Sequence, residues 1–290
     1  MLKHIPITFI GPGVMAEAMI AGLIRRGMSD PQDLVAAGPR PERLEELHQR
    51  YQIRTDTDNA VASECAGIVV LSVKPQRLDK VLAGLQGVIQ PKALVLSIVA
   101  GAPISKISSG MGHPLVVRSM PNTPAQIGQG ITVWTSAPDV SAEQREMARQ
   151  ILTALGEEVY VEEESYLDMA TAVSGTGPAY VFLFMEAMVD AGVHLGFPRR
   201  LAEQLVAQTL RGSVEFYTTR TDPLHLAYLR NQVTSPGGTS AAALYYLEKA
   251  GFRTAISRAI WAAYERSQEL GRDARSKPPD QAQLPSINGT

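Results

Sequence analysis

The chain has 290 residues, of which 45 % are hydrophobic and 19 % are charged, and its formal net charge is −2. This length suffices for two domains, each with its own hydrophobic core. A net charge near zero excludes the basic field that binding to a phosphate backbone requires. We identify no apolar run that approaches the roughly 18 to 20 residues of a membrane span, and no signal-peptide pattern. We therefore expect a cytoplasmic protein with neither a nucleic-acid nor a membrane partner.

The single cysteine, Cys65, cannot form an intrachain disulfide, which agrees with a reducing compartment. It lies shortly before the apolar run Ile68–Val73, so we expect a packed core thiol rather than a nucleophile. The five histidines are dispersed along the chain and fall in no motif. We predict no metal site.

The first half of the chain alternates short β-branched runs with amphipathic stretches. Helical patterns at Met15–Arg26 and Pro41–Tyr51 lie between the earlier runs, which predicts right-handed α/β units and a parallel sheet. The last strands are expected to form an antiparallel edge. The runs that we assign as strands are Ile5–Ile10, Leu34–Ala37, Ile68–Val73, Leu94–Val99, Leu115–Arg118 and Ile131–Thr135.

From about Glu164 onward the pattern becomes helical. The long segments are Pro178–Leu195, Pro198–Tyr217 and Ser240–Leu270, separated by Gly/Pro breaks. Because the first of these carries few charges, both of its faces should be covered, either by another subunit or by the core of its own subunit. We predict an α/β domain at 1–163, an all-helical domain at 164–273, and a disordered tail at 274–290.

A glycine-rich turn, Gly11-Pro12-Gly13-Val14-Met15-Ala16, follows the first predicted strand. In this Gly-x-Gly-x-x-Ala pattern, Gly11 permits a tight turn, Gly13 lets the backbone approach a pyrophosphate, and Ala16 lets the helix pack closely on the sheet. The helix N-terminus adds N–H groups and partial positive charge. A turn without a ligand is the alternative. The position after the first strand favours a dinucleotide site.

The end of the second predicted strand indicates which nicotinamide cofactor would bind. An acid there would bind a ribose 2′-hydroxyl and repel a 2′-phosphate, but the sequence reads Ala37-Gly38-Pro39-Arg40-Pro41. Arg40 is available to pair with the phosphate, or else is a solvated residue near the next helix. NADP is favoured over NAD.

Further motifs lie where ligands usually bind. Lys74, in Val73-Lys74-Pro75, follows a strand that Pro75 is expected to stop, and so reaches the carboxyl edge of the sheet. The segment Thr234–Ser240, TSPGGTS, offers hydroxyls and glycine N–H groups before a helix, which suits a small carboxylate. A simple N-cap and turn is the alternative for that segment.

Taken in order, five motifs resemble the pyrroline-5-carboxylate reductase family along nearly the whole chain. They are Gly11–Ala16, Met120–Ala125 (MPNTPA), Ser174–Tyr180 (SGTGPAY), Thr234–Ser240 and the closing helix Phe252–Leu270. The resemblance implies a Rossmann domain followed by a helical domain that intertwines with a second subunit, giving a homodimer or a larger ring of dimers. It also implies NADPH-dependent reduction of 1-pyrroline-5-carboxylate, a cyclic imino acid, to L-proline.

The family's functional positions carry over residue by residue. The cofactor, NADP(H) with NAD(H) as the alternative, would contact Gly11, Pro12, Gly13, Val14, Met15, Gly38, Pro39, Arg40, Asn59, Val73, Lys74, Pro75 and Ala100. The substrate would contact Glu164, Ser235, Pro236, Gly237, Gly238, Thr239 and Ser240. Thr239 and Ser240 are the catalytic candidates, with the Ser240 hydroxyl close to the imine nitrogen. For Glu164 the alternative is a solvated member of the acidic run Glu162–Glu164.

Four positions depart from the family pattern: Val14 replaces Asn, Arg40 falls one place late, Thr176 replaces Ser, and Ser240 replaces Thr. The last two keep their hydroxyls, although Ser lacks the rotamer restriction of Thr. The first two motivate a second hypothesis, a catalytically weak NADP-binding regulatory relative. A third, a 3-hydroxyacid dehydrogenase, needs a lysine on a long helix, and Lys249 lies instead in what looks like an exposed helix end.

Overall fold

The computed structural model describes residues 2–222 and 224–271. The chain divides into two compact units, which we call the sheet unit (Met1–Thr171 and the chain from Tyr264 onward) and the helical unit (Ala172–Ala263). The return of the last helix to the sheet unit was not expected from the sequence. The predicted tail at 274–290 lies outside the described residues, and the predicted boundary after residue 163 stays a prediction.

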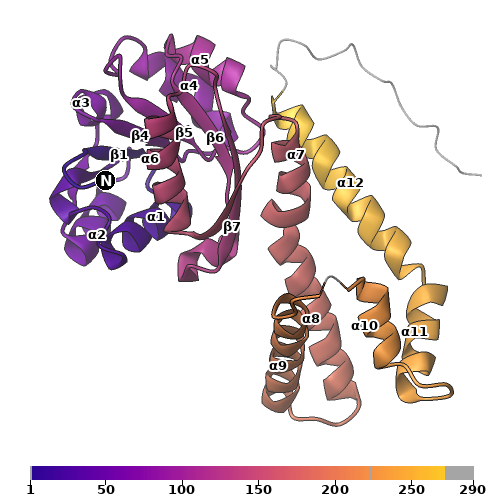
Figure 1. Ribbon diagram of the computed structural model, residues 1–290. Helices are drawn as coiled ribbons and strands as arrows, with labels where there is room; N and C mark the ends of the chain where they lie inside the picture. Colours follow the sequence, from indigo (N-terminus) through magenta and orange to yellow (C-terminus); the bar gives the residue numbers. More distant parts are fainter. Residues whose placement is uncertain (1, 223, 272–290) are drawn as a thin grey trace, which may run out of the picture. The chain divides into compact units, whose positions relative to one another are not determined.

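The sheet unit contains an eight-stranded sheet flanked by helices (Figure 1), in the order β3-β2-β1-β4-β5-β6-β7-β8. All neighbours pair in parallel except β6 and β7, which are antiparallel, so the predicted parallel sheet is confirmed and the last two predicted strands do pair antiparallel. They do not form the edge, because β8, which was not predicted, lies outside β7 and pairs with it in parallel. The strands are β1 (Ile7–Ile10), β2 (Leu34–Ala37), β3 (Arg54–Asp56), β4 (Ile68–Leu71), β5 (Leu94–Ser97), β6 (Val116–Met120), β7 (Gly130–Ser136) and β8 (Gly156–Tyr160).

The central strands are apolar along their whole length because helices cover both faces of a parallel sheet. Every residue of β1, β2, β4 and β5 is buried. One cluster, around Phe9 and Ile20, packs α1 against the sheet, and a second, around Val69 and Leu82, packs α4. The helices of this unit are α1 (Val14–Arg25), α2 (Pro41–Tyr51), α3 (Asn59–Ser63), α4 (Pro75–Leu85), α5 (Ile104–Met111), α6 (Ala142–Thr153) and α7 (Tyr166–Ala170).

Two expectations for this unit are wrong. Cys65 is exposed rather than packed in the core, because it lies in the turn between α3 and β4 and not on the strand. Pro75 does not stop a strand: β4 ends at Leu71, and Pro75 is the first residue of α4. A proline is well tolerated there, since the first N–H of a helix has no intrahelical acceptor.

The helical unit opens with a π-helical turn, Thr171–Gly175. Helices α8 and α9 pack as an antiparallel pair around Val189, Ala202 and Val206. Gly192 permits the close approach, because a Cβ there would lie 3.1 Å from the Ala202 Cβ. The helices are α8 (Gly177–His194), α9 (Arg199–Thr218), α10 (Leu226–Gln232), α11 (Thr239–Lys249) and α12 (Phe252–Gly271), whose last turns belong to the sheet unit.

The predicted helix Ser240–Leu270 is in fact two helices. It breaks at Gly251, whose φ of 75° lies in the left-handed region that glycine adopts without a steric penalty. Helix α10 was not expected, because Leu226–Gln232 is too short to show a clear period.

Few apolar side chains of the helical unit are covered by its own chain. On α8 only Val189 is buried, whereas Phe182 and Leu183 are 62 % and 67 % exposed. Among the described residues, therefore, the core of a single subunit does not cover this helix. The continuous segment Tyr166–His194 is also long and apolar enough to cross a membrane by length and composition, which corrects our expectation that no such segment exists.

Candidate active site

A hollow of about 740 Å³ opens at the carboxyl ends of β1, β2 and β4. The chain runs from β1 to β2 on one side and reaches β4 on the other, so this is the switch point of the sheet, where doubly wound folds bind their ligands. The hollow is lined by Gly11, Gly38, Pro39, Thr57, Asp58, Asn59, Ala60, Val73, Arg77, Lys80, Val81 and Gly84.

Two glycines shape one wall of the hollow. Gly11 has a φ of 87°, and a Cβ there would lie 2.6 Å from Val73 Cγ1. A Cβ at Gly38 would lie 2.7 Å from Pro12 Cδ. Gly13 is the N-cap of α1, and no side chain caps this helix. The N–H groups of its first turn therefore receive no capping oxygen from a side chain. The wall is therefore backbone, suited to the close approach of a pyrophosphate.

Another residue that lines the hollow carries an unsatisfied polar atom. Asn59 Oδ1 is buried and has no hydrogen-bond partner among the described residues. Such an atom costs free energy unless a ligand or water donates to it. Asp58 does not serve the ligand in the same way, because its carboxylate caps α3 by accepting from the Ala60 N–H at 2.8 Å. A glycine wall and a buried acceptor on another lining residue fit a nucleotide with hydroxyl donors.

The predicted cofactor residues divide into three groups. Gly11, Gly38, Pro39, Asn59 and Val73 line the hollow, and Pro12, Gly13, Val14 and Met15 belong to the adjoining turn. Arg40, Lys74, Pro75 and Ala100 are not among the lining residues. Arg40 is the exposed N-cap of α2, and Lys74 is the exposed N-cap of α4.

Sequence reasoning missed the α4 wall of the hollow, formed by Arg77, Lys80, Val81 and Gly84. The signal was present. With α4 beginning at Pro75, spacings of three, four and seven residues place these positions on one helix face. The two cations on that face, Arg77 and Lys80, add positive charge to the lining of the hollow.

In the helical unit, the segment Ser235–Ser240 forms a tight turn into α11. The Gly238 N–H donates to the Ser235 carbonyl at 3.1 Å, and Gly237 has a φ of 72°. Gly238 is the N-cap of α11, with no side-chain cap, and Thr239 is the first helical residue. Ser240 is half-buried in the first turn. The N–H groups of this turn suit an anion such as a carboxylate.

Glu164 lies in a buried charge cluster of the sheet unit. Its carboxylate accepts from Arg118 Nη1 at 3.0 Å and from the Ile104 N–H at 2.7 Å. Arg118, only 5 % exposed, also donates to Asp168 at 2.8 Å, and Asp168 accepts from the Ser267 hydroxyl at 2.9 Å. Glu164 is therefore a paired member of this cluster rather than a simply solvated one, although its side chain is 32 % exposed. Its proposed substrate contact stays a prediction.

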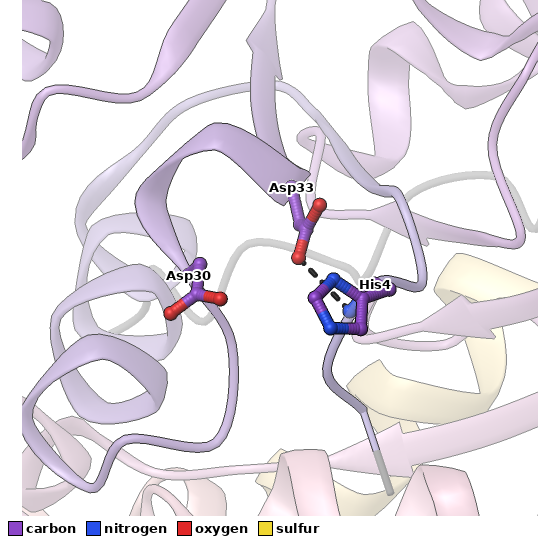
Figure 2. Close-up of side chains that lie close together, drawn as sticks. All are labelled: His4, Asp30 and Asp33. Atoms are coloured by element: carbon purple, nitrogen blue, oxygen red, sulfur yellow. Dashed lines mark hydrogen bonds between the residues drawn. The ribbon is translucent and has the colours of Figure 1, made fainter.

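His4, Asp30 and Asp33 also come together, at the surface of the sheet unit (Figure 2). Their ligand atoms all lie within 4.8 Å of one another. The Asp33 carboxylate already accepts from the His4 backbone N–H at 3.0 Å, and His4 and Asp30 are exposed. Nothing else at this place points to an ion, so we assign no metal to it.

Comparison with known proteins identifies the family. A model of pyrroline-5-carboxylate reductase dimerisation domains matches residues 164–270, and one described as "NADP oxidoreductase coenzyme F420-dependent" matches residues 6–101. The pyrroline-5-carboxylate reductase of Synechocystis is 42 % identical, with 92 % of this chain and 99 % of the relative covered. The chain belongs to the pyrroline-5-carboxylate reductase family.

Other members of the family agree along most of their length. The Pseudomonas aeruginosa enzyme is 41 % identical, covering 91 % of this chain and 96 % of the relative. The solved structure of the Plasmodium falciparum reductase with NADP bound is 32 % identical with a TM-score of 0.85, covering 93 % of this chain and 99 % of the other. The predicted Rossmann-type domain with a helical C-terminal domain is thereby confirmed.

Proposed function

We propose that this protein reduces 1-pyrroline-5-carboxylate to L-proline with NADPH, the last step of proline biosynthesis. The observation that carries the proposal is the match to the Synechocystis reductase, which extends over 99 % of that protein. Two features of the structure support it: a glycine-walled hollow at the switch point of the sheet and, in the helical unit, a turn into α11 that has no side-chain cap.

The cofactor is proposed to bind along Gly11–Met15, Gly38–Arg40, Asn59, Val73–Pro75 and Ala100. The segment after β2, Gly38–Pro41, holds no acid that would bind a ribose 2′-hydroxyl and repel a 2′-phosphate, which supports NADP(H). Arg40 is proposed to pair with that phosphate. When bound, the nicotinamide supplies the hydride that C5 of the substrate accepts. The protein supplies orientation and excludes water.

The substrate carboxylate is proposed to bind the N–H groups of the turn Ser235–Ser240, and Glu164 is a further proposed substrate contact. An iminium accepts a hydride more readily than a neutral imine, so a hydrogen bond to its N–H⁺ favours reaction. The Ser240 hydroxyl oxygen is the proposed acceptor, with Thr239 beside it. Serine is too weak an acid to supply the proton at neutral pH, so the proton comes from solvent or from the substrate.

We also propose that the protein acts in the cytoplasm as a homodimer or as a ring of dimers. The exposed apolar side chains of α8 support self-association, because a patch of this kind needs a cover in water. The dimerisation model that matches residues 164–270 supports the same reading of Tyr166–His194, as an interface helix rather than a membrane span.

One assay separates the three hypotheses. The loss of NADPH absorbance is followed with 1-pyrroline-5-carboxylate and without any substrate, and NADP⁺ reduction is followed with a 3-hydroxyacid. We expect turnover in the first mixture alone. Tight NADPH binding without turnover would favour a regulatory relative, and turnover of the hydroxyacid would favour a dehydrogenase.

Ser240→Ala tests the proposed hydrogen bond to the iminium. A hydrogen bond to a charged group that strengthens in the transition state predicts a fall in kcat of about 10- to 100-fold. The dissociation constant for NADPH should stay within about twofold. Ser240→Thr should retain activity, since it keeps the hydroxyl. Ser213→Ala, which removes a hydroxyl bonded within α9, is the matched control; unchanged kinetics in Ser240→Ala would remove Ser240 from the mechanism.

A further inference from the structure

A cluster of charged side chains lies against the phosphate-binding turn. Arg43 of α2 is at its centre: Nε donates to the Pro12 carbonyl oxygen at 3.1 Å, Nη2 pairs with Glu17 of α1, and Nη1 pairs with Glu46 at 3.0 Å. The Arg43 side chain is 18 % exposed. One guanidinium thus joins the turn, the helix that follows it and the neighbouring helix.

Glu17 is itself held in place. Besides Arg43, its carboxylate accepts from the Tyr51 hydroxyl at 2.9 Å and pairs with Arg50. Burial raises the pKa of Glu17. The hydrogen bonds from Arg43 and Tyr51 and the charge of Arg43 lower it by more than burial raises it, so the pKa of Glu17 lies below its ordinary value. Glu17 is therefore ionised at neutral pH, and it fixes the orientation of Arg43.

The turn needs donors for its carbonyl oxygens. The Gly11 oxygen accepts from the Ser72 hydroxyl at 2.8 Å and from the Gly13 N–H at 2.7 Å. Arg43 provides the donor for the next carbonyl, that of Pro12. Carbonyl dipoles repel a phosphate, whereas the first-turn N–H groups of α1 attract one. Holding both carbonyls on protein donors keeps the N–H side of the turn available to the ligand.

Arg43 is poorly placed to act as a ligand itself. Its Nε and both Nη atoms already have protein partners, and two of those partners are carboxylates. Glu17 and Glu46 compensate its positive charge, so little field remains for a 2′-phosphate. Arg40, exposed at the N-cap of the same helix, has no such compensation in the cluster.

We propose that Arg43, held by Glu17, is a positioning residue that fixes the Pro12 carbonyl and with it the turn Gly11–Met15. This inference rests on the proposed function only in taking a nicotinamide dinucleotide as the ligand. The turn faces the pyrophosphate, a group that NADPH and NADH share. Arg43 therefore supports the binding of both cofactors equally, and Arg40 supports NADPH alone.

The test compares the dissociation constants of NADPH and NADH, measured by nicotinamide fluorescence without substrate. Arg43→Met should raise the dissociation constants of NADPH and NADH alike, by about tenfold, which is the effect of losing a charge-assisted hydrogen bond. It should raise KM for NADPH while leaving kcat at saturation unchanged. Arg43→Lys and Glu17→Gln should lie between wild type and Arg43→Met, because each keeps part of the contact. Arg40→Met should raise the dissociation constant of NADPH and leave that of NADH unchanged.

Arg149→Met is the matched control, since Arg149 forms a similar ion pair with Glu146 on α6, away from the turn. It should bind both cofactors as wild type does. A loss of NADPH affinity alone in Arg43→Met would make Arg43 a phosphate ligand, and unchanged affinity for both would reduce the cluster to a link between two helices. Either outcome overturns the proposal.

Two further measurements keep the test decisive. Thermal unfolding checks that Arg43→Met is folded; if it is not, Arg43→Lys and Glu17→Gln carry the comparison. Wild-type turnover of 1-pyrroline-5-carboxylate is measured on the same preparation. Binding of both dinucleotides without turnover would contradict the proposed function and leave the positioning role of Arg43 testable.

Discussion

The sheet unit and the helical unit treat their apolar side chains in opposite ways. Residues of β1, β4 and β5 are buried on both faces by helices of the same chain. In the helical unit the described buried core is a small cluster at Val189, Ala202 and Val206, and most of the large exposed apolar side chains in the part of the chain that the structure describes belong to this unit. One unit completes its own core, and the other leaves its apolar faces open.

This difference predicts that the proposed cofactor site and the proposed substrate turn depend on self-association to different degrees. Within the sheet unit, the hollow proposed for the dinucleotide is built from turns that a complete core supports, so we expect cofactor binding to need no second copy. The turn into α11 belongs to the unit whose apolar faces need a cover. Substrate turnover should therefore depend on self-association more strongly than cofactor binding does.

The largest expected effect comes from placing a charge on the open face of α8. Phe182→Glu puts a carboxylate where an apolar cover is expected, and desolvating it costs several kcal/mol. We expect a monomer by size-exclusion chromatography with light scattering, a loss of turnover of at least about 100-fold, and NADPH affinity close to wild type.

Val159→Glu is the control, because it adds the same charge to a 43 % exposed position on the edge strand β8, beside Glu157 and Glu158. It should assemble normally. A Phe182→Glu protein that still forms the wild-type oligomer would mean that α8 is not the interface, and an active monomer would contradict the dependence of turnover on assembly.

The sequence predicted the features that are local and missed those that depend on distant packing. Apolar runs in the sequence predict the strands β1, β2, β4 and β5, and a short motif predicts the glycine turn. Strand β3 has only three residues, and β8 (GEEVY) is half-exposed with two glutamates, so no apolar run marks either of them. The periodicity of the sequence shows that a helix face is apolar but not which surface covers it. It therefore could not predict that the faces of the helical unit are left uncovered by this chain.

The site divides in the same way. Gly11, Gly38 and Asn59 were predicted and line the hollow. The contacts of Arg43 with Pro12 and of Asp168 with Ser267 join residues far apart in the sequence, and a single charged residue in a helix gives no sign of its partner. Such pairs become visible only once the fold brings their elements together.

A smaller effect is expected from the buried charge cluster of the sheet unit. Arg118→Met leaves Glu164 and Asp168 without their cation, and unpaired carboxylates in a mostly buried place are destabilising. Because both acids keep some contact with solvent, we expect a loss of about 2–3 kcal/mol in the free energy of unfolding, measured by urea denaturation.

Arg149→Met provides the exposed counterpart. Arg149 pairs with Glu146 on the surface of α6, where water screens the charges, so its loss should leave the free energy of unfolding unchanged. Equal effects of the two substitutions would show that the Arg118 cluster is solvated in the folded protein. They would remove it as a source of the sheet unit's stability.

The smallest expected effect is the contribution of Glu17 to the stability of the sheet unit, and it should depend on pH. The folded-state pKa of Glu17 lies below its ordinary value near 4.5, because Arg43, Tyr51 and Arg50 outweigh the opposing effect of burial. A lowered pKa means that the ionised form stabilises the fold above about pH 4.5, and that this stabilisation is lost as the pH falls through the folded-state pKa. Wild type should thus melt about 1–2 °C above Glu17→Gln at neutral pH, and the gap should close in acid. In an Arg43→Met background the gap should be smaller and flatter with pH, because the principal cation is gone. A gap that persisted undiminished in acid would show that Glu17 stabilises the sheet unit through packing rather than through charge.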